Sequence, residues 1–132
     1  MPVKSDVKIS TLGYVIIYVK DIEKAKTFYR DTLGLTLKFD SPEWVELNTG
    51  STTLALHPDA NLPPKRPETP GWPIVVFNVD NIQEAYEGLK ARGVKFEQEP
   101  QICHEEGDSV GRNASFHDPE GNKLSIYGFG KK

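Results

Sequence analysis

The stretch that decides the fold is GYVIIYVKDIEKAKTFYRDTLGL at residues 13–35, because the chain repeats it as WPIVVFNVDNIQEAYEGLKARGV at residues 72–94. A self-similar pattern at an interval of about 60 residues indicates two copies of one structural unit. Each copy opens with a run of β-branched and aromatic residues, which predicts a strand. Asp21 or Asn81 then provides a side-chain oxygen that caps a helix. Gly34 and Gly93 follow the two predicted helices, at the position where left-handed backbone ends a helix.

After each helix the sequence predicts three short strands separated by turn residues. These strands are Leu35–Phe39, Trp44–Leu47 and Thr52–His57 in the first copy, and Val94–Glu97, Asn113–His117 and Lys123–Phe129 in the second. The predicted fold class is therefore α+β, with two tandem βαβββ modules in a single domain of residues 1–132. The modules are expected at residues 9–58 and 73–130, joined by a proline-rich linker at residues 59–72 that favours extended geometry.

Composition and charge exclude several classes of partner. The chain has 132 residues, and 16 Lys and Arg against 19 Asp and Glu give a net charge of −3, so no basic surface for nucleic acid is expected. No apolar run approaches the roughly 18 residues of a membrane-spanning helix. The N-terminal sequence MPVKSDVKIS lacks the apolar segment of a signal peptide, which predicts a cytoplasmic protein. Cys103 is the only cysteine, so an intrachain disulfide is excluded.

Side chains alternate between the two faces of a strand, so the face that packs against the helix can be separated from the other. The other face combines aromatic, polar and apolar residues, and this combination is typical of a small-molecule site. Its members are Tyr14, Ile16, Trp44, Ala55, His57, Ile74, Ser125 and Tyr127. Arg112 is a further candidate, because its guanidinium group could pair with an anionic ligand at the mouth of the site. The alternatives are a contact surface between sheets or subunits, and for Arg112 an exposed strand end.

The paired units resemble the vicinal oxygen chelate superfamily, which includes glyoxalase I, extradiol dioxygenases and bleomycin-resistance proteins. The resemblance rests on VKDIEKAKTFYRDTLGL at Val19–Leu35 and on DPEGNKLSI at Asp118–Ile126, and it runs from Ile9 to Phe129. It implies a curved, mixed or antiparallel sheet around a ligand hollow, with the helices on the outer face. It also implies a small-molecule ligand and a homodimer, with modules exchanged between chains in some members.

The resemblance also identifies the positions that bind metal in other members of the superfamily. There, His or Glu side chains from four strands hold a divalent ion, and the matching residues here are Tyr14, Ala55, Ile74 and Ser125. Because a divalent ion needs three or four nitrogen or oxygen donors, neither this metal site nor any cofactor is expected. The alternative is a displaced divalent metal site, or a metal-free acid–base pair, around the catalytic candidates His57 and Glu46.

Three functions follow from these observations. The preferred one is a small-molecule-binding protein, similar to the bleomycin-resistance branch, that holds a planar or aromatic ligand by stacking. The second is an enzyme, either a glyoxalase-like lyase or isomerase or a dioxygenase-like oxidoreductase, that uses the surroundings of His57. The third is a structural or regulatory protein whose hollow no longer binds a ligand. The sequence does not identify the ligand.

Overall fold

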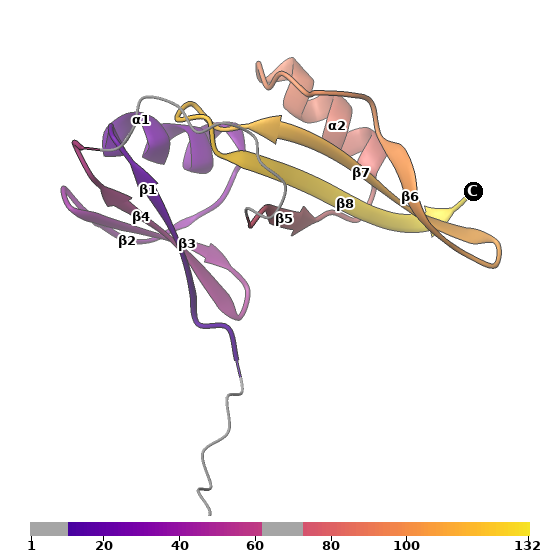
Figure 1. The fold of residues 1–132 in the computed structure, drawn as a ribbon, viewed down its shortest axis with the longest axis horizontal. Helices are drawn as coiled ribbons and strands as arrows, with labels where there is room; N and C mark the ends of the chain where they lie inside the picture. The colour runs from indigo at the N-terminus through magenta and orange to yellow at the C-terminus, as the bar shows by residue number, and fades with distance from the viewer. Residues whose placement is uncertain (1–10, 62–72) are drawn as a thin grey trace, which may run out of the picture.

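The computed structural model describes residues 11–61 and 73–132, which form two modules side by side (Figure 1). The first module contains β1 (Tyr14–Val19), α1 (Ile22–Thr27), a π-helical turn η1 (Phe28–Thr32), β2 (Leu37–Ser41), β3 (Trp44–Thr49) and β4 (Thr52–Pro58). The second contains β5 (Val75–Asn78), α2 (Ile82–Ala91), β6 (Gln101–Glu106), β7 (Ser109–His117) and β8 (Lys123–Lys131). The predicted α+β class with tandem βαβββ units is confirmed. Residues 9 and 10 of the predicted first module and residues 62–72 of the predicted linker lie outside the described residues.

Each module forms its own four-stranded mixed sheet, with the order β1-β4-β3-β2 in the first and β5-β8-β7-β6 in the second. The first strand pairs in parallel with the last, and the other neighbours are antiparallel. Within residues 11–61 and 73–132, no ladder joins the two sheets, so β1 and β5 are both edge strands. The two modules of one chain therefore do not close into one continuous sheet.

The helix boundaries follow the capping residues that the sequence predicts. Asp21 accepts a hydrogen bond from the backbone N–H of Lys24 at 3.1 Å, and Asn81 accepts one from the N–H of Glu84 at 3.0 Å. Gly34 and Gly93 adopt positive φ values of 85° and 97°, as the predicted left-handed positions require. Each helix packs on one face of its own sheet. No helix among the described residues is long and apolar enough to cross a membrane.

The prediction of the second strand in the second copy is wrong. Val94–Glu97 forms only an isolated bridge, between Phe96 and Phe116, and the strand is β6 instead. Val94 is buried, and the Phe96 ring packs 4.8 Å from the Tyr86 ring, so this apolar segment fills the core under α2. All six residues of β6 are exposed, because backbone pairing with β7 rather than burial holds this strand in place. Hydrophobic patterning therefore gave no signal for β6.

The motifs at Val19–Leu35 and Asp118–Ile126 meet where the two modules contact each other. The buried Tyr29 hydroxyl donates a hydrogen bond to the Asp118 Oδ2 atom at 2.7 Å. Asp118 also accepts from the backbone N–H groups of Glu120 and Asn122 and from the Asn122 side-chain amide. Burial, followed by the nearby charge of Asp118 and the hydrogen bond to it, raises the pKa of Tyr29 well above its usual value. Arg92 adds a second link by donating to the Thr32 carbonyl at 2.9 Å.

Candidate functional site

Four aromatic side chains gather on the face of the first sheet that points away from α1. This set, here called the aromatic face, consists of Tyr14, Tyr18, Trp44 and His57. The rings of Tyr18 and His57 stack with centroids 5.1 Å apart, and Trp44 meets His57 edge-on at 6.0 Å and Tyr14 at 6.2 Å. Tyr14 and Tyr18 remain 52% and 41% exposed, so a ligand can reach their rings.

Strand register places these rings around Ala55, whose side chain is a single methyl group. Ala55 pairs with Ile16 on β1 and with Glu46 on β3, so its methyl group lies between the rings. Ala55 itself is fully buried, whereas Ile16 is exposed. The Glu46 Oε2 atom accepts a hydrogen bond from the Trp44 indole N–H at 2.8 Å. The result is an apolar, aromatic surface with one carboxylate at its edge.

The ring of His57 is fixed in one tautomer by its backbone contact. Its Nδ1 atom lies 2.9 Å from the carbonyl oxygen of Pro58, and a carbonyl can only accept a hydrogen bond. Nδ1 therefore carries the proton in the neutral ring, and Nε2 is left as an acceptor. The Glu46 carboxylate is bonded to Trp44, and no hydrogen bond joins it to His57 among the described residues. The predicted acid–base pair thus shares a face without a hydrogen bond between its members.

The remaining candidate residues belong to the second sheet. Ser125 is buried and donates to the carbonyl of Ala114 at 3.1 Å, so its hydroxyl is already engaged. Tyr127 pairs with Asn113 and lies over Gly111, where no Cβ occupies the space of the phenol ring. Ile74 precedes β5 and is exposed.

Arg112 does not share the face of Tyr127. It pairs with Gly128, one position away from the Asn113–Tyr127 pair, so its side chain lies on the opposite side of the sheet. There the Arg112 Nη1 atom donates to the carbonyl of Lys131 at 3.4 Å. The register of β7 therefore separates Arg112 from the other candidate ligand-binding residues.

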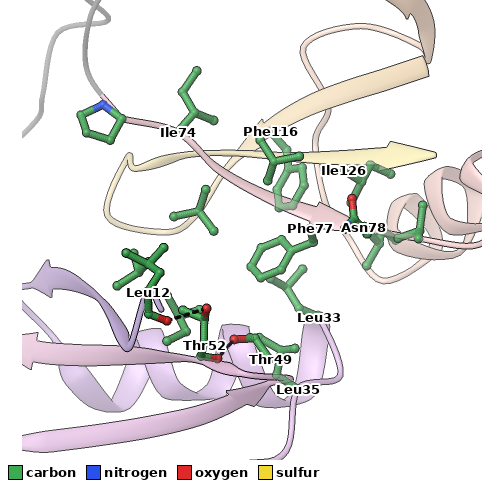
Figure 2. Close-up of a pocket in the computed structure, with 17 residues that line it drawn as sticks. Leu12, Leu33, Leu35, Thr49, Thr52, Ile74, Phe77, Asn78, Phe116 and Ile126 are labelled. Carbon is green, nitrogen blue, oxygen red and sulfur yellow. Dashed lines mark hydrogen bonds between the residues drawn. The ribbon is translucent and has the colours of Figure 1, made fainter. Parts of the chain in front are cut away.

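A groove of about 770 Å³ lies between the modules, but it is not built from the aromatic face. Figure 2 shows Leu33 and Leu35 of the first module across from Phe77, Phe116 and Ile126 of the second. Leu33 and Leu35 follow η1, whereas Phe77, Phe116 and Ile126 come from the helix-packing side of the second sheet. Of the residues predicted to bind a ligand, only Ile74 lines this groove. Five of the others, namely Tyr14, Ile16, Trp44, Ala55 and His57, lie together on the first sheet.

The four positions that the resemblance matches to the metal ligands of the superfamily do not fit a divalent ion here. Ala55 and Ile74 offer no donor atom, and the Ser125 hydroxyl donates to a backbone carbonyl. Of the four residues, only Tyr14 has a side-chain oxygen that is not hydrogen-bonded to a backbone carbonyl. One oxygen is too few, because a divalent ion needs at least three protein donors. In the part of the chain that the structure describes, no group of three or more His, Cys, Asp or Glu side chains is placed to hold a metal.

Lys38 also belongs to this face, and sequence analysis did not identify it. Its Nζ atom donates to the hydroxyl of Thr53, the residue that pairs with Tyr14, at 2.9 Å. The register of β2 shifts between Leu37 and Phe39, and this bulge changes which side chains share a face. Strict alternation could not predict that shift, so no signal in the sequence pointed to Lys38.

Comparisons with known proteins agree with this architecture. The family model of the Glyoxalase/Bleomycin resistance protein/Dioxygenase superfamily matches residues 11–126. The Bacillus subtilis protein YurT is 34% identical over 122 residues, covering 83% of this chain and 92% of YurT. The glutathione transferase FosA of Serratia marcescens is 27% identical over 119 residues, covering 90% of this chain and 81% of FosA.

A solved structure gives the same result in three dimensions. TnmS3, an antibiotic-binding protein from Streptomyces sp. CB03234, superposes with a TM-score of 0.68 at 26% identity, covering 91% of this chain and 96% of TnmS3. The repeated βαβββ unit, the two motifs in contact and the match over residues 11–126 lead to one conclusion. The chain belongs to the Glyoxalase/Bleomycin resistance protein/Dioxygenase superfamily.

Proposed function

We propose that this protein binds a small planar aromatic molecule on the aromatic face, without a metal ion at the usual position of the superfamily. The observation that carries the proposal is the continuous set of rings, with centroid distances from 5.1 to 6.2 Å, on an accessible sheet surface. Offset and edge-on ring contacts favour flat aromatic ligands beyond the effect of buried area alone. The similarity to TnmS3, an antibiotic-binding protein, supports the binding of a small molecule.

A second copy of the chain completes the site in this proposal. The edge strand β1 carries the exposed side chains of Tyr14, Ile16 and Tyr18, and the β5 edge carries those of Ile74 and Val76. Unpaired, apolar strand edges favour pairing with another chain. In a symmetric homodimer, β1 of one copy lies beside β5 of the other, and the contact occurs twice. The Tyr127 face of one copy then lies opposite the aromatic face of its partner.

Sedimentation velocity tests the dimer. The unmodified protein is expected at twice the mass of one chain, and Ile16→Lys is expected to give single chains because it places a charge on the β1 edge. Ile102→Lys is the matched control, since Ile102 is similarly exposed, 49% against 45% for Ile16, but lies on β6. Single chains in the unmodified protein, or equal effects of both variants, would contradict the proposed pairing.

Calorimetric titration with acridine at pH 8 tests the binding function, because acridine is planar, aromatic and uncharged there. Trp44→Leu is expected to weaken binding by about tenfold or more, since it removes the ring that contacts both Tyr14 and His57. Phe28→Leu removes a ring that is half-buried like Trp44, but from η1 on the opposite side of the first sheet, and is expected to change the affinity little. Prior dialysis against EDTA is expected to leave binding unchanged. Loss of binding after EDTA would contradict the metal-free site.

The second candidate function is catalysis by His57. The contact of its Nδ1 atom with the Pro58 carbonyl leaves Nε2 as a proton acceptor on the aromatic face, as a general base requires. An enzyme of this kind would convert a bound compound, and His57→Gln would remove turnover. Product analysis after incubation with α-ketoaldehyde–thiol adducts and with catechols distinguishes the two candidates.

A further inference from the structure

We propose that the aromatic face selects planar cations, such as heteroaromatic rings with a quaternary or protonated nitrogen, over neutral rings of the same shape. This inference rests on the proposed binding function and specifies its ligand class. Four rings surround the site, and Glu46 supplies a carboxylate at the edge of the Trp44 indole. A cation is attracted both to the faces of aromatic rings and to a carboxylate.

The carboxylate of Glu46 is incompletely satisfied by the protein. Its Oε2 atom accepts the Trp44 indole N–H, which is a neutral donor, and the side chain is half-buried. No Lys, Arg or His forms an ion pair with Glu46 among the described residues. A partly buried carboxylate without a cationic partner gains more from a bound cation than an exposed one, because water screens the interaction less.

The other charged side chains near the site, Lys38 and Asp40, already have partners within the protein. Lys38 reaches the same face, but its Nζ atom donates to the Thr53 hydroxyl on β4. Asp40 pairs with Val45, whose side chain is buried in the core, and its carboxylate binds the Lys26 ammonium at 3.2 Å. Glu46 is therefore the carboxylate of this face that is left for a ligand, and Lys38 is a cation on the same face that opposes it.

The test compares acridine with 10-methylacridinium, which has the same ring system and a permanent positive charge, by calorimetric titration at pH 8. The unmodified protein is expected to bind the cation about tenfold more tightly than acridine. Glu46→Gln is expected to remove most of this ratio and leave the acridine affinity nearly unchanged. Lys38→Met is expected to raise the ratio. Glu43→Gln, which removes a charge from the exposed turn before β3, is the control for overall charge.

The outcomes separate this inference from the proposed function. Equal affinities for the two compounds would overturn the selection of cations while binding itself stands. The same loss of ratio in Glu43→Gln as in Glu46→Gln would overturn the role of the Glu46 carboxylate, because overall charge would then explain the preference. Binding of neither compound would overturn both. Retention of the tenfold ratio in Glu46→Gln would show that the rings alone attract the cation, and would overturn the role of the carboxylate.

Discussion

The hydrogen bond between Tyr29 and Asp118 gives the sharpest test of how the modules are held together. Tyr29→Phe removes one hydroxyl and keeps the ring, so no sizeable cavity forms in the core. The lost bond is 2.7 Å long, buried at both ends, and links residues 89 positions apart. Its removal is expected to affect the contact between the modules rather than the formation of η1.

The magnitude follows from the partners of the carboxylate. A hydrogen bond to a charged group contributes roughly 1.5–3 kcal/mol to stability. Asp118 keeps three other donors at 2.8 to 2.9 Å after the substitution, so its charge is not left without partners. We therefore expect the free energy of unfolding to fall by about 2 kcal/mol. For a chain of this length, that corresponds to a decrease in Tm of roughly 6–10 °C.

The assay is urea unfolding followed by circular dichroism at fixed protein concentration, because self-association would otherwise change the apparent stability. Tyr86→Phe is the matched control. Tyr86 is also buried, in α2, but its hydroxyl has no hydrogen-bond partner in the described part of the chain. In an Asp118→Asn background, Tyr29→Phe is expected to cost much less, which gives a coupling energy of about 1–2 kcal/mol. A change below about 0.5 kcal/mol for Tyr29→Phe alone would refute the reasoning.

Three further predictions follow from the same structure. The raised pKa of Tyr29 means that the unfolded chain loses this proton first, so stability is expected to fall as pH rises above about 10. Urea unfolding between about pH 9 and 11 should show that the free energy of unfolding falls less steeply with pH in Tyr29→Phe than in the unmodified protein. Identical pH dependence in the two proteins would contradict this prediction. Gly128→Ala is expected to cost about 1–3 kcal/mol, because the new Cβ would lie 3.0 Å from Ile82 Cβ and 3.3 Å from its backbone nitrogen. The control is Gly130→Ala, where nothing lies within 4 Å. Gly111→Ala is expected to displace the Tyr127 phenol, seen as a shifted ring resonance by NMR, and an unmoved ring would show that the strand yields instead.

Much of the fold could be predicted because its signals are local. The two helix starts depend on Asp21 and Asn81, whose side chains bond to backbone N–H groups three residues later. The alternation in β1 correctly separated Ile17 and Val19, which are buried, from Tyr14, which is exposed. Five of the candidate ligand-binding residues consequently share one face of the first sheet. Their role in binding stays a prediction that the titrations above test.

Other features could not be predicted because they depend on pairing between distant strands. The strand β6 is exposed along its whole length and exists through its ladder with β7, so its own sequence carries no alternating pattern. The register of β7 decides that Arg112 lies on the face opposite Tyr127. A bulge in β2 brings Lys38 to Thr53. In each case the position of a side chain is set by a neighbour far away in the sequence.

The sequence by itself determined the repeated βαβββ unit and the ends of the helices. It also predicts that Tyr14, Ala55, Ile74 and Ser125 stand at the positions matched to metal ligands of the superfamily. These features depend on residue identity and on contacts within a few residues. Only the tertiary structure decided that the two sheets remain separate, that their edge strands are exposed and that the Tyr29 hydroxyl meets Asp118. The physical reason is that sheet register, edge exposure and contacts between modules arise from the free energy of packing distant segments together, which no local pattern encodes.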